Sequence, residues 1–218
     1  MKQYSQLLSF SRLLRLVAIA SIPVLVSSCL SLEAEFDLRR PGQTDLTIHY
    51  HLHESLWELG VFDENSPERA VPVSRRDAEE TALRYRDVTL QDHRVLREGE
   101  RVTVTVRYRA GSTESLQGLW GEAGGGPLTV RGDGRGITIP LAAQSSPLEA
   151  NQRELFDTIL RNEFARITVL APETVRSGSA GGAGVPGEEE RAGNRYTFTV
   201  PMADLLAAPQ PFSLEVEW

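Results

Sequence analysis

Three histidines occupy alternate positions in one short segment, His49, His51 and His53. Residues two apart on a β-strand point to the same side and lie about 6 to 7 Å apart, so these imidazoles would project together. Two such side chains can share a tetrahedral Zn²⁺, and a third ligand beside an open position would make a catalytic site. Because Asp45 and Thr47 continue the same face, the row can equally be the solvated side of a half-buried strand. We favour this second interpretation and keep Zn²⁺ binding as an alternative.

The chain carries no other pattern that is typical of an enzyme. The GxSxG nucleophile elbow, the Walker loop, the GxGxxG turn and the HExxH zinc signature are all missing from the sequence. Neighbouring carboxylates such as Glu79 and Glu80 belong to polar surface segments, which favours solvated charges over an acid and base pair. We therefore expect a non-enzymatic protein without a resident cofactor.

The only cysteine, Cys29, ends an N-terminal segment with the features of a secretion signal. Three basic residues (Lys2, Arg12 and Arg15) come first, and an apolar run from Leu16 to Val26 follows. That run is shorter than the roughly 20 apolar residues that span a bilayer, but its length suits a signal peptide. The next residues, Val-Ser-Ser-Cys, resemble the bacterial lipobox. In that motif the signal peptidase cuts before a Cys whose thiol carries a diacylglycerol.

Cleavage between Ser28 and Cys29 gives three parts. They are a signal peptide (residues 1–28), a lipidated N-terminus (29–31) and a single extracytoplasmic domain (32–218). The mature chain has 20 arginines, no lysine and 30 acidic residues, a formal charge of −10. This balance argues against a nucleic-acid partner, which would require a basic surface. Membrane attachment would come from acyl chains such as palmitate, each buried CH₂ contributing about 0.8 kcal/mol.

These features predict a protein anchored by lipid to a bacterial cell membrane, on its extracytoplasmic side. Leu30 follows Cys29 in place of the Asp that is associated with inner-membrane retention in some Gram-negative bacteria. The outer membrane is therefore favoured if the source is Gram-negative.

A second short motif, Arg131-Gly132-Asp133, is identical to the tripeptide that host integrins bind. It falls in a glycine-rich turn between two predicted strands, where the tripeptide can also occur by chance. Host adhesion through this turn is a further functional alternative.

Period-2 alternation predicts most of the remaining elements as strands. Three hairpins are expected, with strands at Leu32–Leu38 and Leu46–Leu52, Val88–Leu96 and Val102–Arg109, and Pro127–Arg131 and Gly136–Leu141. Pro41 and Gly42 suit the centre of a type II turn in the first hairpin. Further strands are expected at Arg166–Leu170, Arg195–Val200 and Phe212–Trp218. Residues 177–194, rich in Gly, Ala and Glu, are expected to form a mobile loop.

Helices are predicted at three places. Ser74 and Asp77 suggest a capped start for a short helix that ends at Leu83. A long amphipathic helix is expected from Pro147 to Phe164, with Ser146 as its cap, and a short turn from Met202 to Ala207. These elements predict an α+β domain with a mainly antiparallel β-sheet and the long helix packed on it.

The order of these features resembles that of the LppM-type bacterial lipoproteins. The resemblance rests on the lipobox, the early strand pair, the central hairpin, and the segments Ala171–Val175 and Arg195–Pro201. It implies a compact envelope domain associated with lipids or glycolipids, and it carries over no catalytic residue. The leading functional hypothesis is thus a membrane-anchored envelope lipoprotein that binds a lipid, glycan or protein partner.

Overall fold

The computed structural model describes residues 30–54, 57, 74–121, 126–141, 153–154, 157–158, 160–181, 186–208 and 212–218. Cys29, Ser28 and the remainder of the signal segment lie outside the described residues. The strands are β1 (Leu30–Arg40), β2 (Gln43–His53), β3 (Val88–Glu98), β4 (Arg101–Ala110), β5 (Thr129–Val130), β6 (Gly136–Leu141), β7 (Phe164–Leu170), β8 (Ser177–Gly181), β9 (Glu188–Ala192), β10 (Arg195–Pro201) and β11 (Phe212–Glu217). The helices are α3 (Arg75–Leu83), α4 (Thr113–Trp120) and α6 (Met202–Ala207).

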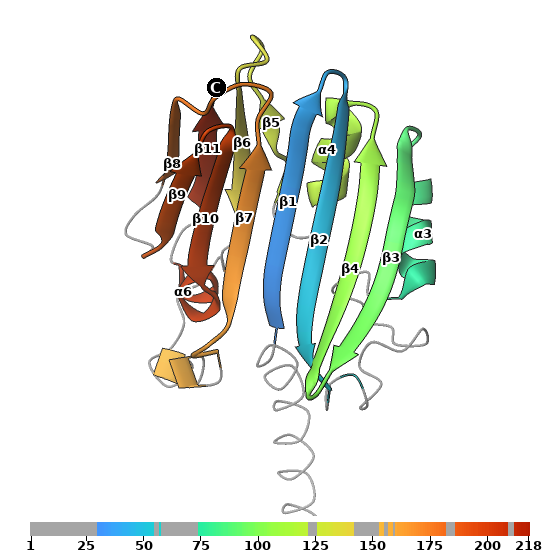
Figure 1. Ribbon diagram of the computed structural model, residues 1–218, viewed down its shortest axis with the longest axis vertical. Helices are drawn as coiled ribbons and strands as arrows, with labels where there is room; N and C mark the ends of the chain where they lie inside the picture. The colour runs from blue at the N-terminus through green and yellow to red at the C-terminus, as the bar shows by residue number, and fades with distance from the viewer. Residues whose placement is uncertain are drawn as a thin grey trace, which may run out of the picture.

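Two sheets form the body of the molecule (Figure 1). The larger has seven strands in the order β3-β4-β2-β1-β7-β10-β9, and the smaller has four in the order β5-β6-β11-β8. Every neighbouring pair is antiparallel except β1 and β7, which run parallel. The mainly antiparallel sheet expected from the sequence is therefore confirmed for the described residues.

Alternation of apolar and polar residues positions β1 and β2 in the large sheet. Phe36 lies opposite Leu46 and Ala34 opposite Ile48, and all four side chains are buried. Gly42 adopts a φ of 70° in the turn between the strands, a conformation that glycine takes without steric cost. The first hairpin thus forms as predicted, with β1 starting at Leu30 instead of Leu32.

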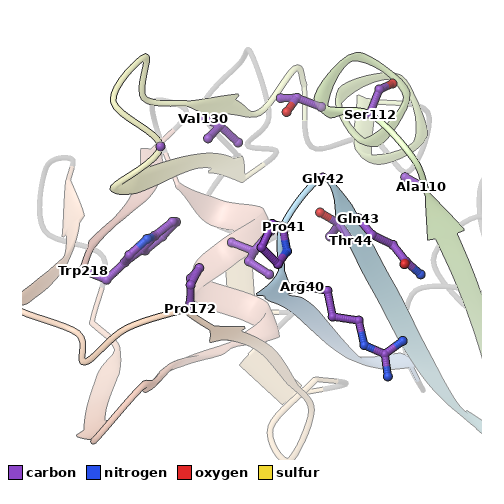
Figure 2. Close-up of a pocket in the computed structure, with 13 residues that line it drawn as sticks. Arg40, Pro41, Gly42, Gln43, Thr44, Ala110, Ser112, Val130, Pro172 and Trp218 are labelled. Atoms are coloured by element: carbon purple, nitrogen blue, oxygen red, sulfur yellow. The ribbon is translucent and has the colours of Figure 1, made fainter.

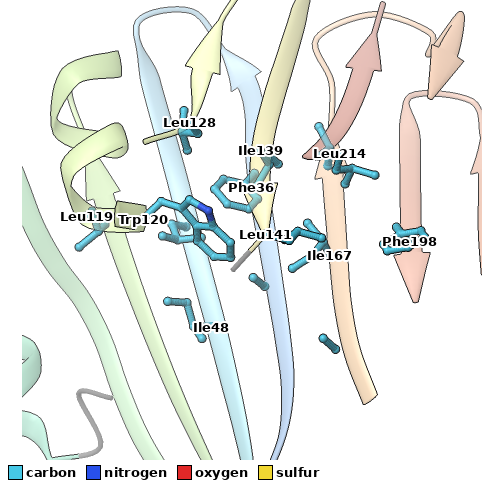
Figure 3. Close-up of a cluster of buried hydrophobic side chains, with 14 of the residues drawn as sticks. Phe36, Ile48, Leu119, Trp120, Leu128, Ile139, Leu141, Ile167, Phe198 and Leu214 are labelled. Carbon is cyan, nitrogen blue, oxygen red and sulfur yellow. The ribbon is translucent and has the colours of Figure 1, made fainter. Parts of the chain in front are cut away.

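The core lies between the two sheets (Figure 3). Trp120, the last residue of α4, packs edge-on against Phe36 of the large sheet, with ring centroids 5.1 Å apart and planes at 68°. Its indole N–H donates a 3.0 Å hydrogen bond to the carbonyl of Pro140 in the small sheet. One side chain therefore joins both layers, and the helix that carries it was not predicted from the sequence.

The prediction for Pro147–Phe164 is wrong at its C-terminal end. Residues 160–162 form a turn and Phe164 is the first residue of β7, so a helix cannot extend to this position. Helical residues are described at 153–154 and 157–158, whereas Ser146 and most of the predicted span lie outside the described residues. The predicted helix extends too far because Leu160 and Phe164 are four residues apart, which is the spacing of apolar residues on one helix face. In the structure these two residues instead lie in a turn and at the start of a strand.

The loop prediction for residues 177–194 is wrong for residues 177–181 and 188–192, which form β8 and β9. Residues 182–185 lie outside the described residues. Strands β8 and β9 pair with β11 and β10, and Gly178 in β8 and Gly187 just before β9 leave room for core aromatic rings. The ring of Tyr196 lies directly over Gly178, and the ring of Phe198 lies over Gly187, where any side chain would collide. Glycine at these positions therefore lets large core aromatics fill space beside the backbone.

The short helices agree with the sequence. Ser74 caps α3 by accepting a 3.1 Å hydrogen bond from the backbone N–H of Asp77, and its hydroxyl donates to the Asp77 carboxylate. Met202–Ala207 is helical as expected. Within the described residues, no helix is long and apolar enough to cross a membrane.

Candidate functional site

The histidine row lies on the polar, outward face of the large sheet. In the strand register His49 stands between Thr105 of β4 and Glu33 of β1, and His51 stands between Thr103 and Ser31. Apolar residues of the same strands, Ile48 and Leu52 among them, point to the core on the other face. The alternation therefore places the imidazoles on one side, as the sequence predicted.

His49 and His51 are held in parallel by their neighbours. Their rings stack at 12° with centroids 6.4 Å apart. The Nδ1 atom of His49 shares a 2.9 Å hydrogen bond with the hydroxyl of Thr105, and that of His51 shares a 3.1 Å bond with Thr103. The Nε2 atom of His51 lies 3.4 Å from a carboxylate oxygen of Glu33. Both rings thus already have hydrogen-bonding partners within the sheet.

Burial lowers the pKa of His51, because removing the imidazolium from water disfavours its charged form. The nearby Glu33 carboxylate acts in the opposite direction and Arg101 acts in the same direction as burial. His51 is therefore biased towards the neutral form in the folded protein.

His53 has different neighbours from His49 and His51. Its side chain is 41% exposed, and its Nε2 atom lies 3.5 Å from a carboxylate oxygen of Glu100. Across the described part of the chain, no three His, Cys, Asp or Glu side chains are grouped so that they could hold a metal ion. Zn²⁺ binding by His49, His51 and His53 stays the alternative interpretation of this row.

Arginine and threonine continue this polar face towards β9. Arg166 contacts Glu33 at 3.3 Å and Arg195 contacts Glu35 at 3.3 Å. Between β7, β10 and β9 the two arginines line a depression of about 330 Å³ together with Thr168, Thr197, Thr199 and Glu188–Glu190. Because the arginines are paired with Glu33 and Glu35, the three glutamates of β9 give the depression an excess of negative charge.

A second pocket, called here the turn pocket, opens where the β1–β2 turn meets the small sheet (Figure 2). Its volume is about 380 Å³. The residues that line it are Leu38, Arg40, Pro41, Gly42, Gln43, Thr44, Ala110, Ser112, Thr113, Val130, Gly134, Pro172 and Trp218. None of them is His, Cys, Asp or Glu, so the lining is suited to binding and carries no group that accepts a proton near neutral pH.

The turn pocket combines an apolar wall with a polar rim. Trp218 and Leu38 are 4% and 9% exposed, and they form the base of the wall beside Pro172. Arg40 is exposed at the rim and forms no ion pair within the described residues. Its neighbour Arg39 differs, because its guanidinium makes a bidentate contact with Asp37 at 2.9 and 2.7 Å.

Three segments from distant parts of the sequence hold the pocket in shape. The backbone N–H of Trp218 donates to the carbonyl of Arg135 at 3.1 Å, and that of Arg176 donates to Glu217 at 2.8 Å. Ser112 caps α4 by accepting a 3.2 Å bond from the N–H of Ser115. The wall and rim are therefore fixed by ladder and cap hydrogen bonds.

The Arg131-Gly132-Asp133 turn lies beside this pocket, and its charged groups contact the protein itself. Arg131 forms an ion pair with Glu217 and lies 3.8 Å from Asp133. Asp133 also accepts a 2.9 Å hydrogen bond from the N–H of Arg135. An integrin would have to compete with these contacts, and host adhesion through the turn stays a prediction.

The sequence indicates the histidine row and the turn at Pro41 but does not indicate the turn pocket. The pocket depends on Pro172, Val130 and Trp218 reaching the β1–β2 turn, and nothing in the local pattern of these residues indicates that approach. Pro41 and Arg40 are ordinary residues for a hairpin turn, so the sequence carries no signal for this pocket.

Comparison with known proteins places few constraints on function. No protein-family model matches the chain, and no curated protein matches it either. Among solved structures it is similar to the folded domain of Mycobacterium tuberculosis LppM, determined by NMR, with a TM-score of 0.48 and 12% identity. The alignment covers 87% of this chain and 90% of that one. This is a weak structural resemblance to a lipoprotein domain, and no residue role is carried over from it.

Proposed function

We propose that this chain is a non-enzymatic envelope lipoprotein, anchored through acyl chains on Cys29, that binds an extracytoplasmic partner in the turn pocket. The observation that supports this function best is the pocket itself, which combines an apolar wall, a rim with Arg40, and a lining that contains no His, Cys, Asp or Glu. Ligand sites typically occupy about 300 to 1,000 Å³ and combine apolar walls with a few polar groups. The 380 Å³ of the turn pocket falls within that range.

The location of the pocket argues for a partner outside the bilayer. Leu30, which follows Cys29 directly, begins β1, and Arg40 ends the same strand at the pocket. Ten residue steps at about 3.3 Å each separate them by about 33 Å. A lipid still embedded in the membrane would not reach this end of the domain.

The chemistry of the lining favours a protein segment with an acidic side chain. Arg40 supplies a planar guanidinium that pairs well with a carboxylate. Leu38, Val130 and Pro172 would contact an adjacent apolar side chain, and a glycan would gain little from these groups. A protein partner is therefore preferred over a lipid or glycan.

Photo-crosslinking in cells tests this function. A benzophenone amino acid is placed at Gln43, which lines the pocket, or at Glu80, which is exposed on α3 far from it. We expect a specific protein adduct from position 43 and none of that mass from position 80. Mass spectrometry of the adduct separates a protein partner from a glycan or lipid.

Two neighbouring arginines provide a matched control. Arg40→Gln should remove the adduct formed at position 43, because it removes the guanidinium at the rim of the pocket. Arg39→Gln removes an equal charge that is already engaged by Asp37 and should leave the adduct intact. Equal adducts from positions 43 and 80, or equal effects of the two substitutions, would contradict binding in the turn pocket.

A further inference from the structure

Two adjacent large apolar side chains, Val95 and Leu96, are exposed near the end of β3. Their exposed fractions are 40% and 55%. Because successive strand residues point to opposite faces, apolar surface is presented on both sides of the strand at this level. β3 is an edge strand of the large sheet, and residues from Arg94 to Glu100 are all exposed. Single apolar residues on a surface are ordinary, but an adjacent pair at a hairpin end is a candidate contact.

The strand register places this pair level with the start of β1. Leu96 pairs with Thr103, Thr103 with His51, and His51 with Ser31. Arg97 is connected in the same way, through β4 and β2, to Leu30. The span from β3 to β1 covers three strand spacings, about 14 Å. Figure 1 shows the β3–β4 turn at the same end of the sheet as the beginning of β1.

The chain leaves almost no length between this end and the proposed anchor. Cys29 is followed directly by Leu30, the first residue of β1. Acyl chains attached at Cys29 would therefore hold the end of the sheet against the membrane surface, without a linker to separate them. We propose that the end of the β3–β4 hairpin, residues Arg94–Arg101, rests on that membrane surface through Val95 and Leu96. This inference rests on the lipid anchor of the proposed function.

Charge makes only a small contribution to the proposed contact. Arg94 is paired with Asp92 at 2.8 Å, and Arg97 lies over the ring of Trp57, 5.6 Å from its centroid. Glu98 and Glu100 offset part of the remaining positive charge at the hairpin end. The hairpin end presents apolar area and no basic cluster. Its binding to the membrane should therefore depend more on Val95 and Leu96 than on anionic lipid.

A contact of this kind would orient the domain. The acyl chains fix one point at the start of β1, and the hairpin adds a second point three strands away. Two points on the same end of the sheet keep the strands inclined out of the membrane, with the turn pocket held at the far end.

Quenching by lipid-borne spin labels tests the contact on the full-length, processed lipoprotein in phosphatidylcholine and phosphatidylglycerol vesicles. Lipidation consumes the thiol of Cys29, so Glu98→Cys provides a single site for an environment-sensitive fluorophore. Arg135→Cys provides a matching labelling position at the opposite end of the molecule, in the β5–β6 turn. We expect doxyl-labelled lipids to quench the fluorophore at position 98 and to leave that at position 135 unquenched.

Aspartate substitutions test whether the membrane contact depends on Val95 and Leu96. Val95→Asp with Leu96→Asp, in the Glu98→Cys protein, should abolish quenching. Leu83→Asp changes a leucine that is 84% exposed on α3, and quenching at position 98 should persist. Circular dichroism checks that each variant is folded, which is expected because all three side chains are at least 40% exposed.

The outcomes separate this inference from the anchor on which it rests. Mass spectrometry first measures acylation of Cys29. An acylated protein without quenching at position 98, with equal quenching at both positions, or with quenching that survives the double aspartate change overturns the membrane contact alone. An unacylated Cys29 overturns both the anchor and the contact.

Discussion

Leu30 and Arg40 are the two end residues of β1, and about 33 Å of extended backbone joins the proposed anchor to the turn pocket. The strand is paired on both sides, antiparallel to β2 and parallel to β7, so it lies in the interior of the large sheet. The two ends are therefore rigidly connected. Attachment of one end to a membrane determines where the other end can meet a partner.

Trp120 is expected to contribute strongly to stability. Its ring packs against Phe36, and its N–H bonds to Pro140, so it joins the two sheets. Trp120→Ala should reduce the free energy of unfolding by about 3 to 5 kcal/mol. Urea denaturation followed by circular dichroism measures this change. Leu83→Ala, at an 84% exposed position, serves as the control, and an equal loss in both variants would contradict the role assigned to Trp120.

Gly178 is predicted to be intolerant of a side chain. The ring of Tyr196 occupies the space where its Cβ would lie, so Gly178→Ala must displace a buried aromatic or the backbone of β8. We expect the free energy of unfolding to fall by about 1 to 3 kcal/mol. At Gly132 an added methyl group would meet open space, and Gly132→Ala should change stability by less than about 0.5 kcal/mol. Chemical denaturation measures the free energy of unfolding of both variants, and equal values would contradict the prediction.

His51 should titrate below the ordinary histidine pKa of 6.5, because burial disfavours its charged form. The unfolded chain then binds a proton more readily than the folded protein between the two pKa values. Stability is consequently full above pH 6.5 and falls as the pH decreases through this window. NMR titration of the imidazole measures the midpoint directly.

The pH dependence of unfolding provides a second readout for His51. In His51→Gln the fall in the free energy of unfolding below pH 6.5 should be smaller than in the unaltered protein. A midpoint at or above 6.5 for His51, together with an unchanged pH profile in the variant, would show that burial does not control this group.

The histidine row is predicted to bind Zn²⁺ poorly. Two nitrogens bound to one Zn²⁺ at about 2.0 to 2.1 Å lie at most about 4 Å apart. The rings of His49 and His51 are parallel with centroids 6.4 Å apart, and each is bonded to a threonine. Metal analysis of protein purified without a histidine tag should find less than one Zn²⁺ per chain. One Zn²⁺ per chain, lost when His49, His51 and His53 are all changed to Ala, would instead support the metal hypothesis.

Much of the fold could be predicted from alternation alone. The first hairpin, the Val102–Arg109 strand and the terminal strand from Phe212 all carry apolar residues at every second position, which is the pattern of a half-buried strand. Ser74 also predicts the start of α3, because its hydroxyl caps the helix through contacts that are local in the sequence. These features depend on neighbours in sequence, and the sequence is sufficient for them.

Features that depend on distant segments were not predictable. The composition of residues 177–181 suggests a loop, but the segment forms a strand that pairs with distant β11, and Gly178 leaves room there for the ring of Tyr196. The approach of Trp218 to the β1–β2 turn depends on the pairing of β11 with β6 and β8, and that of Pro172 depends on the parallel pairing of β7 with β1. The division into two sheets, and with it the turn pocket, therefore required the three-dimensional arrangement.

Mass spectrometry of the N-terminal peptide, from protein purified from a bacterial membrane fraction, tests the lipid anchor directly. We expect a mature chain that begins at Cys29 and carries a diacylglyceryl group on its thiol. Cys29→Ala should abolish both the acyl group and the cleavage before residue 29. An N-terminus at another residue, or a free thiol on Cys29 in the membrane-bound protein, would contradict the lipid anchor and the orientation of the domain derived from it.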